Sequence, residues 1–183
     1  LAVALYAAIV WQVLNLWPRD AVSTGSSVSL SGLARWGLPL TVLVYLMILS
    51  GGLVAGTDAG FSYPTWPKMG PGYIPPGLYA SSPAWIAAFE DVTTIQFNHR
   101  LFAYALFFMV GAYGLTLIRR GADAGLRLSG AAVVLVLLIQ LTLGISTILS
   151  HVAVPVAAAH QGGAILLLTV MLFSADALRR RTS

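Results

Sequence analysis

The sequence predicts an all-α, polytopic membrane protein with five transmembrane helices, the last four of which form an up-down bundle. Charged residues make up 9% of the 183 residues and hydrophobic residues 58%, whereas soluble globular proteins carry about 25% charged residues. The apolar residues fall into five long runs, and a run of about 20 apolar residues can cross a bilayer as a helix. The absence of cysteine argues against disulfides and thiolate metal sites.

The first apolar run, over 1–17, predicts a helix slightly shorter than a bilayer core. At 1.5 Å per residue it measures about 25 Å. It begins without methionine inside apolar sequence, so we interpret it as a truncated helix. Residues 18–36 are expected to form a cytoplasmic linker, since 21–32 are rich in Ser, Gly and Thr.

The four remaining runs predict a four-helix bundle over 37–178. Its helices are expected at 38–56, 95–118, 128–149 and 155–178. The first of them is expected to break at Gly51-Gly52, and Pro155 is placed at the first position of the last. Residues 179–183 are expected to form a basic cytoplasmic tail.

The segment 57–94 predicts a packed cap at one membrane surface. It holds six of the nine prolines, which forbid a regular helix, and its many aromatic residues suit a membrane interface. A long loop with its own apolar content is more readily explained as packed than as free. Within the cap, 84–89 predicts a short interfacial helix.

The arginines set the expected orientation of these helices. They concentrate at 18–36, at 119–127 and at the C-terminus, whereas the cap and the turn at 150–154 carry few basic residues. By the positive-inside rule, the arginine-rich side faces the cytoplasm and the cap faces outward. The net charge of +4 therefore reflects topology, and we expect no binding of nucleic acid.

Two histidines occupy matching places in this scheme. His99 and His160 each lie about five residues into a helix that enters from the cap side, so both are about 6–8 Å below the same surface. In an up-down bundle their helices are parallel and diagonally opposed, and a diagonal of about 11–14 Å fits two imidazoles on one iron. Neutral imidazole suits iron. We therefore expect His99 and His160 to be the axial ligands of one heme.

Four further residues are expected to contact this cofactor: Arg100, Phe102, Gln161 and Gly163. Phe102 and Gly163 share a helix face with the two histidines, where Phe102 could stack on the porphyrin and Gly163 leaves room for it. Arg100 could pair with a propionate or extend to the outer surface, and the second is the default expectation.

Simpler interpretations compete for the same residues. A membrane histidine can hydrogen-bond a neighbouring helix, and small residues also serve helix packing. His151, in the outer turn, is expected to be solvated. Gln140, deep in its helix, is expected to bridge two helices, although it could face the cofactor.

Five ordered blocks then carry a resemblance to a known family: VAGTDAG at 54–60, WPKMG at 66–70, QFNHR at 96–100, LGIST at 143–147 and AHQ at 159–161. These blocks resemble heme A synthase of the mitochondrial and alphaproteobacterial type. The resemblance implies eight transmembrane helices in two similar four-helix halves and the oxidation of a heme O methyl group to the formyl group of heme A, for cytochrome oxidase. It also implies a bis-histidine heme b in the second half, with ligands that match His99 and His160.

The resemblance further implies that this chain is the C-terminal half of the enzyme. Residues 1–17 resemble the last helix of the N-terminal half, and the first half's histidine pair and carboxylate have no counterpart here. We therefore expect no catalytic residue in this chain and no activity from it alone. The expected partners are heme O, an electron-transfer partner, heme O synthase and the lipid bilayer, with a homo-oligomer left open. The expected location is the inner membrane, of a bacterium by preference over a mitochondrion.

Two other functions stay open from the residues. A plain b-type electron-transfer protein would need only the bis-histidine heme. A non-enzymatic membrane assembly subunit would use the histidines structurally. The pigment of the protein distinguishes the three functions. Heme A produced from heme O indicates the synthase, heme b alone indicates the electron-transfer protein, and no heme indicates the assembly subunit.

Overall fold

The computed structural model describes residues 1–17 and 28–182, and its regular elements are helices. The prediction of an all-α fold is confirmed for these residues. The helices are α1 (Ala2–Leu16), α2 (Val28–Gly56), α3 (Ala87–Glu90), α4 (Val92–Arg120), α5 (Ala124–Leu149) and α6 (Val154–Thr182), with 3-10 turns η1 (Ala59–Phe61) and η2 (Ala84–Ile86).

Four of these helices, α2, α4, α5 and α6, are long and apolar enough to cross a membrane. Their outward surfaces carry large apolar side chains, for example Leu101, Phe108 and Leu135, as expected where lipid replaces water. Helix α1 is apolar but has 15 residues, about 22 Å at 1.5 Å per residue. The chain is thus a polytopic membrane protein, and its described helices support four spans, not the expected five.

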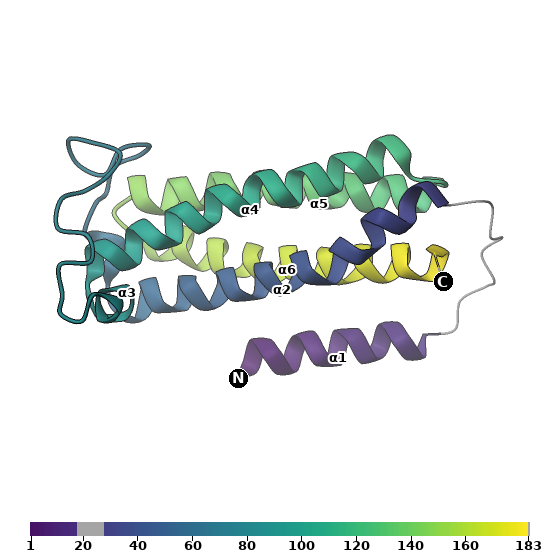
Figure 1. Ribbon diagram of the computed structural model, residues 1–183, viewed down its shortest axis with the longest axis horizontal. Helices are drawn as coiled ribbons and strands as arrows, with labels where there is room; N and C mark the ends of the chain where they lie inside the picture. The colour runs from purple at the N-terminus through teal and green to yellow at the C-terminus, as the bar shows by residue number, and fades with distance from the viewer. Residues whose placement is uncertain (18–27, 183) are drawn as a thin grey trace.

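The four long helices form a bundle in which α2 and α5 each pack against both α4 and α6. This order places α4 and α6 on one diagonal of the bundle and α2 and α5 on the other. Helix α1 lies along α6, outside the bundle (Figure 1). The cap and the α5–α6 turn lie at one end of the molecule, while the α4–α5 connection and the C-terminus lie at the other (Figure 1).

The core of the bundle is apolar and is densest in the half away from the cap. Leu117, Leu126, Val133, Leu168 and Met171 are all fully buried there. Close helix approach contributes to this packing, because a Cβ on Gly130 would lie only 2.6 Å from the carbonyl oxygen of Gly114. Small residues at such crossings let two backbones meet.

Two expectations about the first bundle helix are wrong: its start and a break within it. Part of the expected linker, 18–27, lies outside the described residues, but 28–36 is helical and belongs to α2. Leu33 and Ala34 pack against the core, so tertiary contacts override the weak helix propensity of this stretch. The expected break at Gly51-Gly52 is absent, and α2 continues through both glycines to Gly56.

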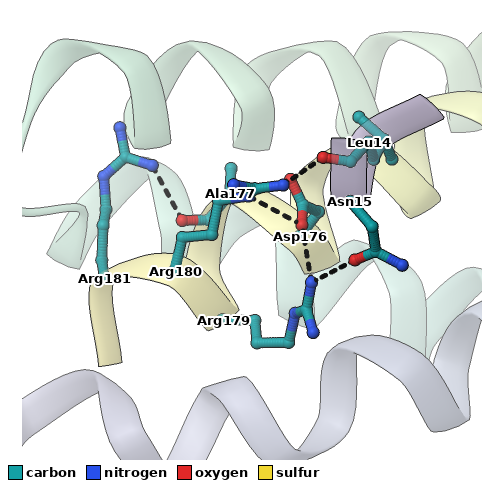
Figure 2. Close-up of polar contacts among 7 residues, drawn as sticks. All are labelled: Leu14, Asn15, Asp176, Ala177, Arg179, Arg180 and Arg181. Atoms are coloured by element: carbon teal, nitrogen blue, oxygen red, sulfur yellow. Dashed lines mark hydrogen bonds and ion pairs between the residues drawn. The ribbon is translucent and has the colours of Figure 1, made fainter. Parts of the chain in front are cut away.

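The last helix is also longer than expected, because α6 continues to Thr182 and includes most of the expected basic tail. Its arginines are held by polar partners at this end of the bundle (Figure 2). Arg179 donates to the Asp176 carboxylate at 3.1 Å and to Asn15 Oδ1 at 2.7 Å, and Arg180 Nε donates to Asp176 at 2.9 Å. Arg180 also donates to the Leu14 carbonyl oxygen. This network ties α1 to the end of α6.

A second ion pair at this end joins α6 to the start of α5. Arg181 donates to Asp123 at 2.6 Å, and Asp123 also caps α5 by accepting from the backbone N–H of Leu126 at 2.9 Å. The hydrogen bond from Arg181 holds the pKa of the Asp123 carboxyl below its usual value. The last turn of α6 is therefore fixed on both sides.

The cap at the opposite end is mostly irregular, as its prolines predict. Its short interfacial helix is confirmed, since η2 over Ala84–Ile86 leads directly into α3 over Ala87–Glu90. Large apolar side chains are exposed around it: Phe61, Trp66, Tyr73, Ile74, Tyr79, Trp85 and Phe89. Aromatic side chains at the end of a bundle of spans suit the level of the lipid headgroups.

The first prediction concerns topology. Ser81, in the cap, and Ala122, between α4 and α5, are both exposed and lie at opposite ends of the bundle. Because the chain has no cysteine, Ser81→Cys and Ala122→Cys each introduce one thiol. We expect an impermeant maleimide to label them from opposite sides of a sealed membrane, with Ala122→Cys on the cytoplasmic side. Labelling of both from one side would contradict the bundle's orientation.

Candidate functional site

His99 lies on α4, seven residues after Val92, the first residue of that helix. Its ring packs against α2, where Ser50 Oγ and His99 Nδ1 are hydrogen-bonded at 3.1 Å. A Cβ on Gly51 would lie 3.4 Å from His99 Cε1, an ordinary van der Waals contact. With Nδ1 engaged by Ser50, Nε2 is the ring nitrogen left to bind another group.

His160 lies on α6, six residues after Val154, the first residue of that helix. Its ring packs against α5, where a Cβ on Gly144 would lie 2.9 Å from His160 Cε1. The backbone carbonyl oxygen of His160 accepts from Gln140 Nε2 at 3.0 Å. His160 Nδ1 is buried, and no hydrogen-bond partner for it occurs in the part of the chain that the structure describes.

The two histidines share one level of the bundle. Both helices begin at the cap end (Figure 1), and both histidines lie about two turns, roughly 10 Å, along them. The two histidines belong to the diagonal pair of helices, and each is braced by one of the other two.

This arrangement fits a heme held between two axial imidazoles. A ligating histidine normally has its other ring nitrogen hydrogen-bonded, and the Ser50 contact supplies that for His99. A buried ring nitrogen without a partner, as at His160, is costly unless something binds there. Among the described residues, His, Cys, Asp and Glu do not gather in groups of three or more that could hold a metal ion. A bare metal ion held by side chains is therefore less well supported than a porphyrin that brings its own equatorial ligands.

The structure places the other expected cofactor contacts differently. Phe102 is partly buried and packs against the apolar core, so its stacking on a porphyrin stays a prediction. Gln161 is exposed on α6, which leaves its predicted contact without support. Gly163 faces Gln140, since a Cβ there would lie 2.3 Å from Gln140 Oε1. The expectation that Gln140 bridges two helices is confirmed.

Arg100 does not extend to the outer surface, and that default expectation is wrong. Its side chain is buried, with 6% exposed, because it donates into the cap. The guanidinium donates to the carbonyl oxygens of Tyr63 at 2.7 Å and Thr65 at 2.8 Å, with a longer contact to Lys68 at 3.4 Å. Pairing of Arg100 with a propionate stays a prediction.

The first turns of α4 hold the cap at three further points. Gln96 Nε2 donates to the carbonyl oxygens of Gly60 and Tyr63. Tyr79 donates its hydroxyl to Asn98 Oδ1 at 2.8 Å, and its backbone N–H to Thr94 Oγ1 at 3.3 Å. The QFNHR block thus combines a histidine that faces the bundle with neighbours that anchor the cap above it.

One other histidine and three carboxylates at this end are exposed or cap a helix. His151 is exposed in the α5–α6 turn, as expected for a solvated side chain. Asp91 caps α4 by accepting from the backbone N–H of Thr94 at 2.7 Å. Asp58 and Glu90 are exposed. These four residues need no role in a cofactor site.

The sequence interpretation missed Ser50 and Gly144, which contact the rings of His99 and His160. Ser50 precedes Gly51-Gly52, which had been interpreted only as a helix break, and Gly144 lies within the LGIST block. A polar residue beside a glycine, at the same membrane depth as a histidine on another helix, is the sequence feature that indicates such a contact. It could not be used, because it requires knowing which helices are neighbours.

Comparisons with known proteins place the chain in a family. The family described as "Cytochrome oxidase assembly protein" matches residues 1–172. Heme A synthase of Nitrosospira multiformis is 41% identical over 99% of this chain, and that of Nitrosomonas eutropha is 38% identical over 94%. Heme A synthase COX15 of Arabidopsis thaliana is 33% identical over 98%.

These matches cover only part of the relatives. The aligned region makes up 51% of the Nitrosospira protein, 49% of the Nitrosomonas protein and 40% of the Arabidopsis protein. The chain therefore spans about half the length of the curated relatives it matches. No solved structure matches it.

A second prediction tests the anchoring of the cap. Arg100→Gln removes the charged donors that hold the carbonyls of Tyr63 and Thr65, and hydrogen bonds to charged groups contribute about 1.5–3 kcal/mol each. We expect the backbone amides of 60–70 to exchange with deuterium at least about tenfold faster, measured by mass spectrometry. Arg119→Gln, at an exposed position, is the matched control and should leave exchange in the cap unchanged. Equal exchange in the two variants would contradict the anchoring role.

Proposed function

The chain belongs to the cytochrome oxidase assembly protein family that includes the heme A synthases, and from this membership we propose that it forms the heme b-binding half of a heme A synthase. The observation that carries the proposal is the pair His99 and His160, placed at one level on diagonal helices and braced by Ser50 and Gly144. Four membrane-spanning helices surround the pair.

The residues present would hold the heme as follows. His99 would bind iron through Nε2, because Ser50 occupies Nδ1. His160 would be the second iron ligand, with its helix position fixed by Gln140. When bound, a bis-histidine heme b supplies one-electron transfer. The apolar bundle and the cap anchored by Arg100 would shield both imidazoles from bulk water.

The whole enzyme's reaction is proposed to be the oxidation of a methyl group of heme O to the formyl group of heme A. This change adds one oxygen atom from water and removes four electrons and four protons, so an electron acceptor is required. An acid or base near the reacting carbon is also required. The outer carboxylates in this chain, Asp58, Glu90 and Asp91, cap helices or are exposed. We therefore assign the chemistry and the heme O site to residues outside this chain.

Helix α1 fits a boundary between two such halves. It lies outside the four-helix bundle and packs mainly against α6. In this proposal α1 is the last helix of the N-terminal half-bundle and the fifth span, and the bundle over 28–182 forms the second half. Heme O synthase, an electron-transfer partner and a second copy of the enzyme are the proposed partners. The proposed location is the inner membrane of a bacterium, although relatives occur in bacteria and in a plant.

An electron-transfer protein is the second candidate, because the paired histidines alone would suffice for it. A structural assembly subunit is the third candidate, in which the two histidines would serve only helix packing and interhelical hydrogen bonds such as that from Ser50. The pigments extracted from the natural protein distinguish the three, as heme A, heme b alone or no heme.

The third prediction tests the ligands. His99→Ala and His160→Ala should each abolish the low-spin bis-imidazole absorption spectrum of the purified protein, because a single imidazole leaves iron high-spin. His151→Ala removes an exposed histidine of the same end and should leave the spectrum unchanged. Retention of the low-spin spectrum in both ligand variants would refute the proposed site.

The fourth prediction separates cofactor binding from catalysis. Residues 1–183, expressed alone in membranes, should bind one heme b per chain, because both proposed ligands and their braces lie in one bundle. The same chain, given heme O and an electron acceptor, should form no hydroxylated or formyl product by chromatography of the extracted pigments. Detection of either product would place the active site in this half.

A further inference from the structure

The contact between α5 and α6 contains a reciprocal pair of side chains and glycines. His160 of α6 points at Gly144 of α5, where an added Cβ would lie 2.9 Å from Cε1 and 3.5 Å from each ring nitrogen. Gln140 of α5 points at Gly163 of α6, where an added Cβ would lie 2.3 Å from Oε1. Each helix thus presents one polar side chain and one glycine to the other.

The spacing of these four residues follows from helix geometry. Gln140 and Gly144 are four residues apart on α5, and His160 and Gly163 are three apart on α6, so each pair occupies one face of its helix. The helices are antiparallel, which brings the deeper Gln140 to the deeper Gly163 and Gly144 to His160. The hydrogen bond from Gln140 Nε2 to the His160 carbonyl oxygen, 3.0 Å, closes the arrangement.

The same contact has a looser counterpart at the other histidine. The nearest atom to a Cβ on Gly51 is His99 Cε1, at 3.4 Å, so an alanine fits there. At Gly144 the three nearest atoms all belong to the His160 ring, and 2.9 Å is shorter than real Cβ contacts allow. His99 has a hydrogen bond from its ring to Ser50. No such bond to the His160 ring occurs among the described residues, so packing must fix that ring.

We propose that Gly144, Gln140 and Gly163 form an interlock that sets the height and direction of the His160 imidazole. Gly144 admits the ring, and Gln140 fixes the helix position of His160 through its carbonyl oxygen. Gly163 acts by making room for Gln140, and not by making room for a porphyrin. These three are positioning residues, and the inference rests on the proposed role of His160 as a heme ligand.

The first experiment compares alanine at the two glycines that face histidines. Gly144→Ala and Gly51→Ala are made in the natural full-length protein, with His160→Ala as the baseline for loss of this heme. Gly144→Ala should lower the affinity for heme b by about tenfold or more, the lower end expected for supporting residues around a metal. It should also convert part of the remaining low-spin signal in electron paramagnetic resonance to high-spin. Gly51→Ala, the matched control, should behave as the unmodified protein.

The second experiment tests the role of Gly163 by rescue. Gly163→Ala should displace the Gln140 carboxamide and break its bond to the His160 carbonyl oxygen, so its heme affinity should fall by about fivefold, the equivalent of one neutral hydrogen bond. Gln140→Ala should show a similar loss. The double variant should be no worse than Gln140→Ala alone, because the clash needs the carboxamide. Gly162→Ala, where an added Cβ meets nothing within 4 Å, is the control.

The outcomes separate the inference from the function on which it rests. Absence of bis-histidine heme from the unmodified protein would refute the proposed function. Normal heme binding and spectra in Gly144→Ala would refute the interlock and leave that function standing. Additive losses in the Gly163→Ala, Gln140→Ala double variant would overturn the assigned role of Gly163. If Gly144→Ala does not elute as a folded protein in detergent, the rescue experiment alone decides.

Discussion

The structure depends on one constraint, which is that polar side chains inside a membrane bundle need partners that the lipid cannot supply. Histidine is demanding in this respect because its ring has two nitrogens. At His99 one of them is hydrogen-bonded by Ser50 from the neighbouring helix. At His160 the buried Nδ1 has no partner in the described part of the chain. A group that bonded to this nitrogen would remove that deficit, so the histidine pair is compatible with a cofactor between the two helices.

The two ends of the bundle solve the same problem in different ways. At the end away from the cap, charged groups pair with one another: Asp176 is buried against Arg179 and Arg180, and these two arginines donate to Asn15 and Leu14 of α1 (Figure 2). At the cap end, the buried cation Arg100 donates from Nη1 and Nη2 to backbone carbonyls of an irregular segment, while its Nε has no partner among the described residues. Charge-assisted hydrogen bonds of this kind hold geometry well. The two histidines therefore lie beneath a cap that Arg100, the residue after His99, holds in place.

Much of this organisation was predictable from the sequence because it follows from composition and period. The apolar runs predict the long helices, and the prolines predict the irregular cap. The short helix expected at 84–89 is also present. The errors arose where tertiary contacts decide. The α2 start at Val28 depends on packing of residues such as Leu33 against the core. The end of α6 depends on partners of Arg181 that are remote in sequence. The hydrogen bonds from Arg100 to the cap could not be predicted. An arginine that extends to the outer membrane surface and an arginine that donates to a folded cap have the same sequence context.

The two histidines are held by different forces, and this difference has a chemical consequence. Ser50 hydrogen-bonds the His99 ring directly, and such a contact at Nδ1 orients a ligand and can change its basicity. The His160 ring is positioned by packing against Gly144, and Gln140 hydrogen-bonds only to the backbone carbonyl oxygen of His160. Steric positioning leaves the electronic character of an imidazole nearly unchanged. An iron bound between the two would therefore have inequivalent axial ligands, with Ser50 able to tune the His99 side and the interlock controlling only geometry on the other. The two supports should thus affect different properties of the site: Ser50 its redox potential, and Gly144 its ligand occupancy.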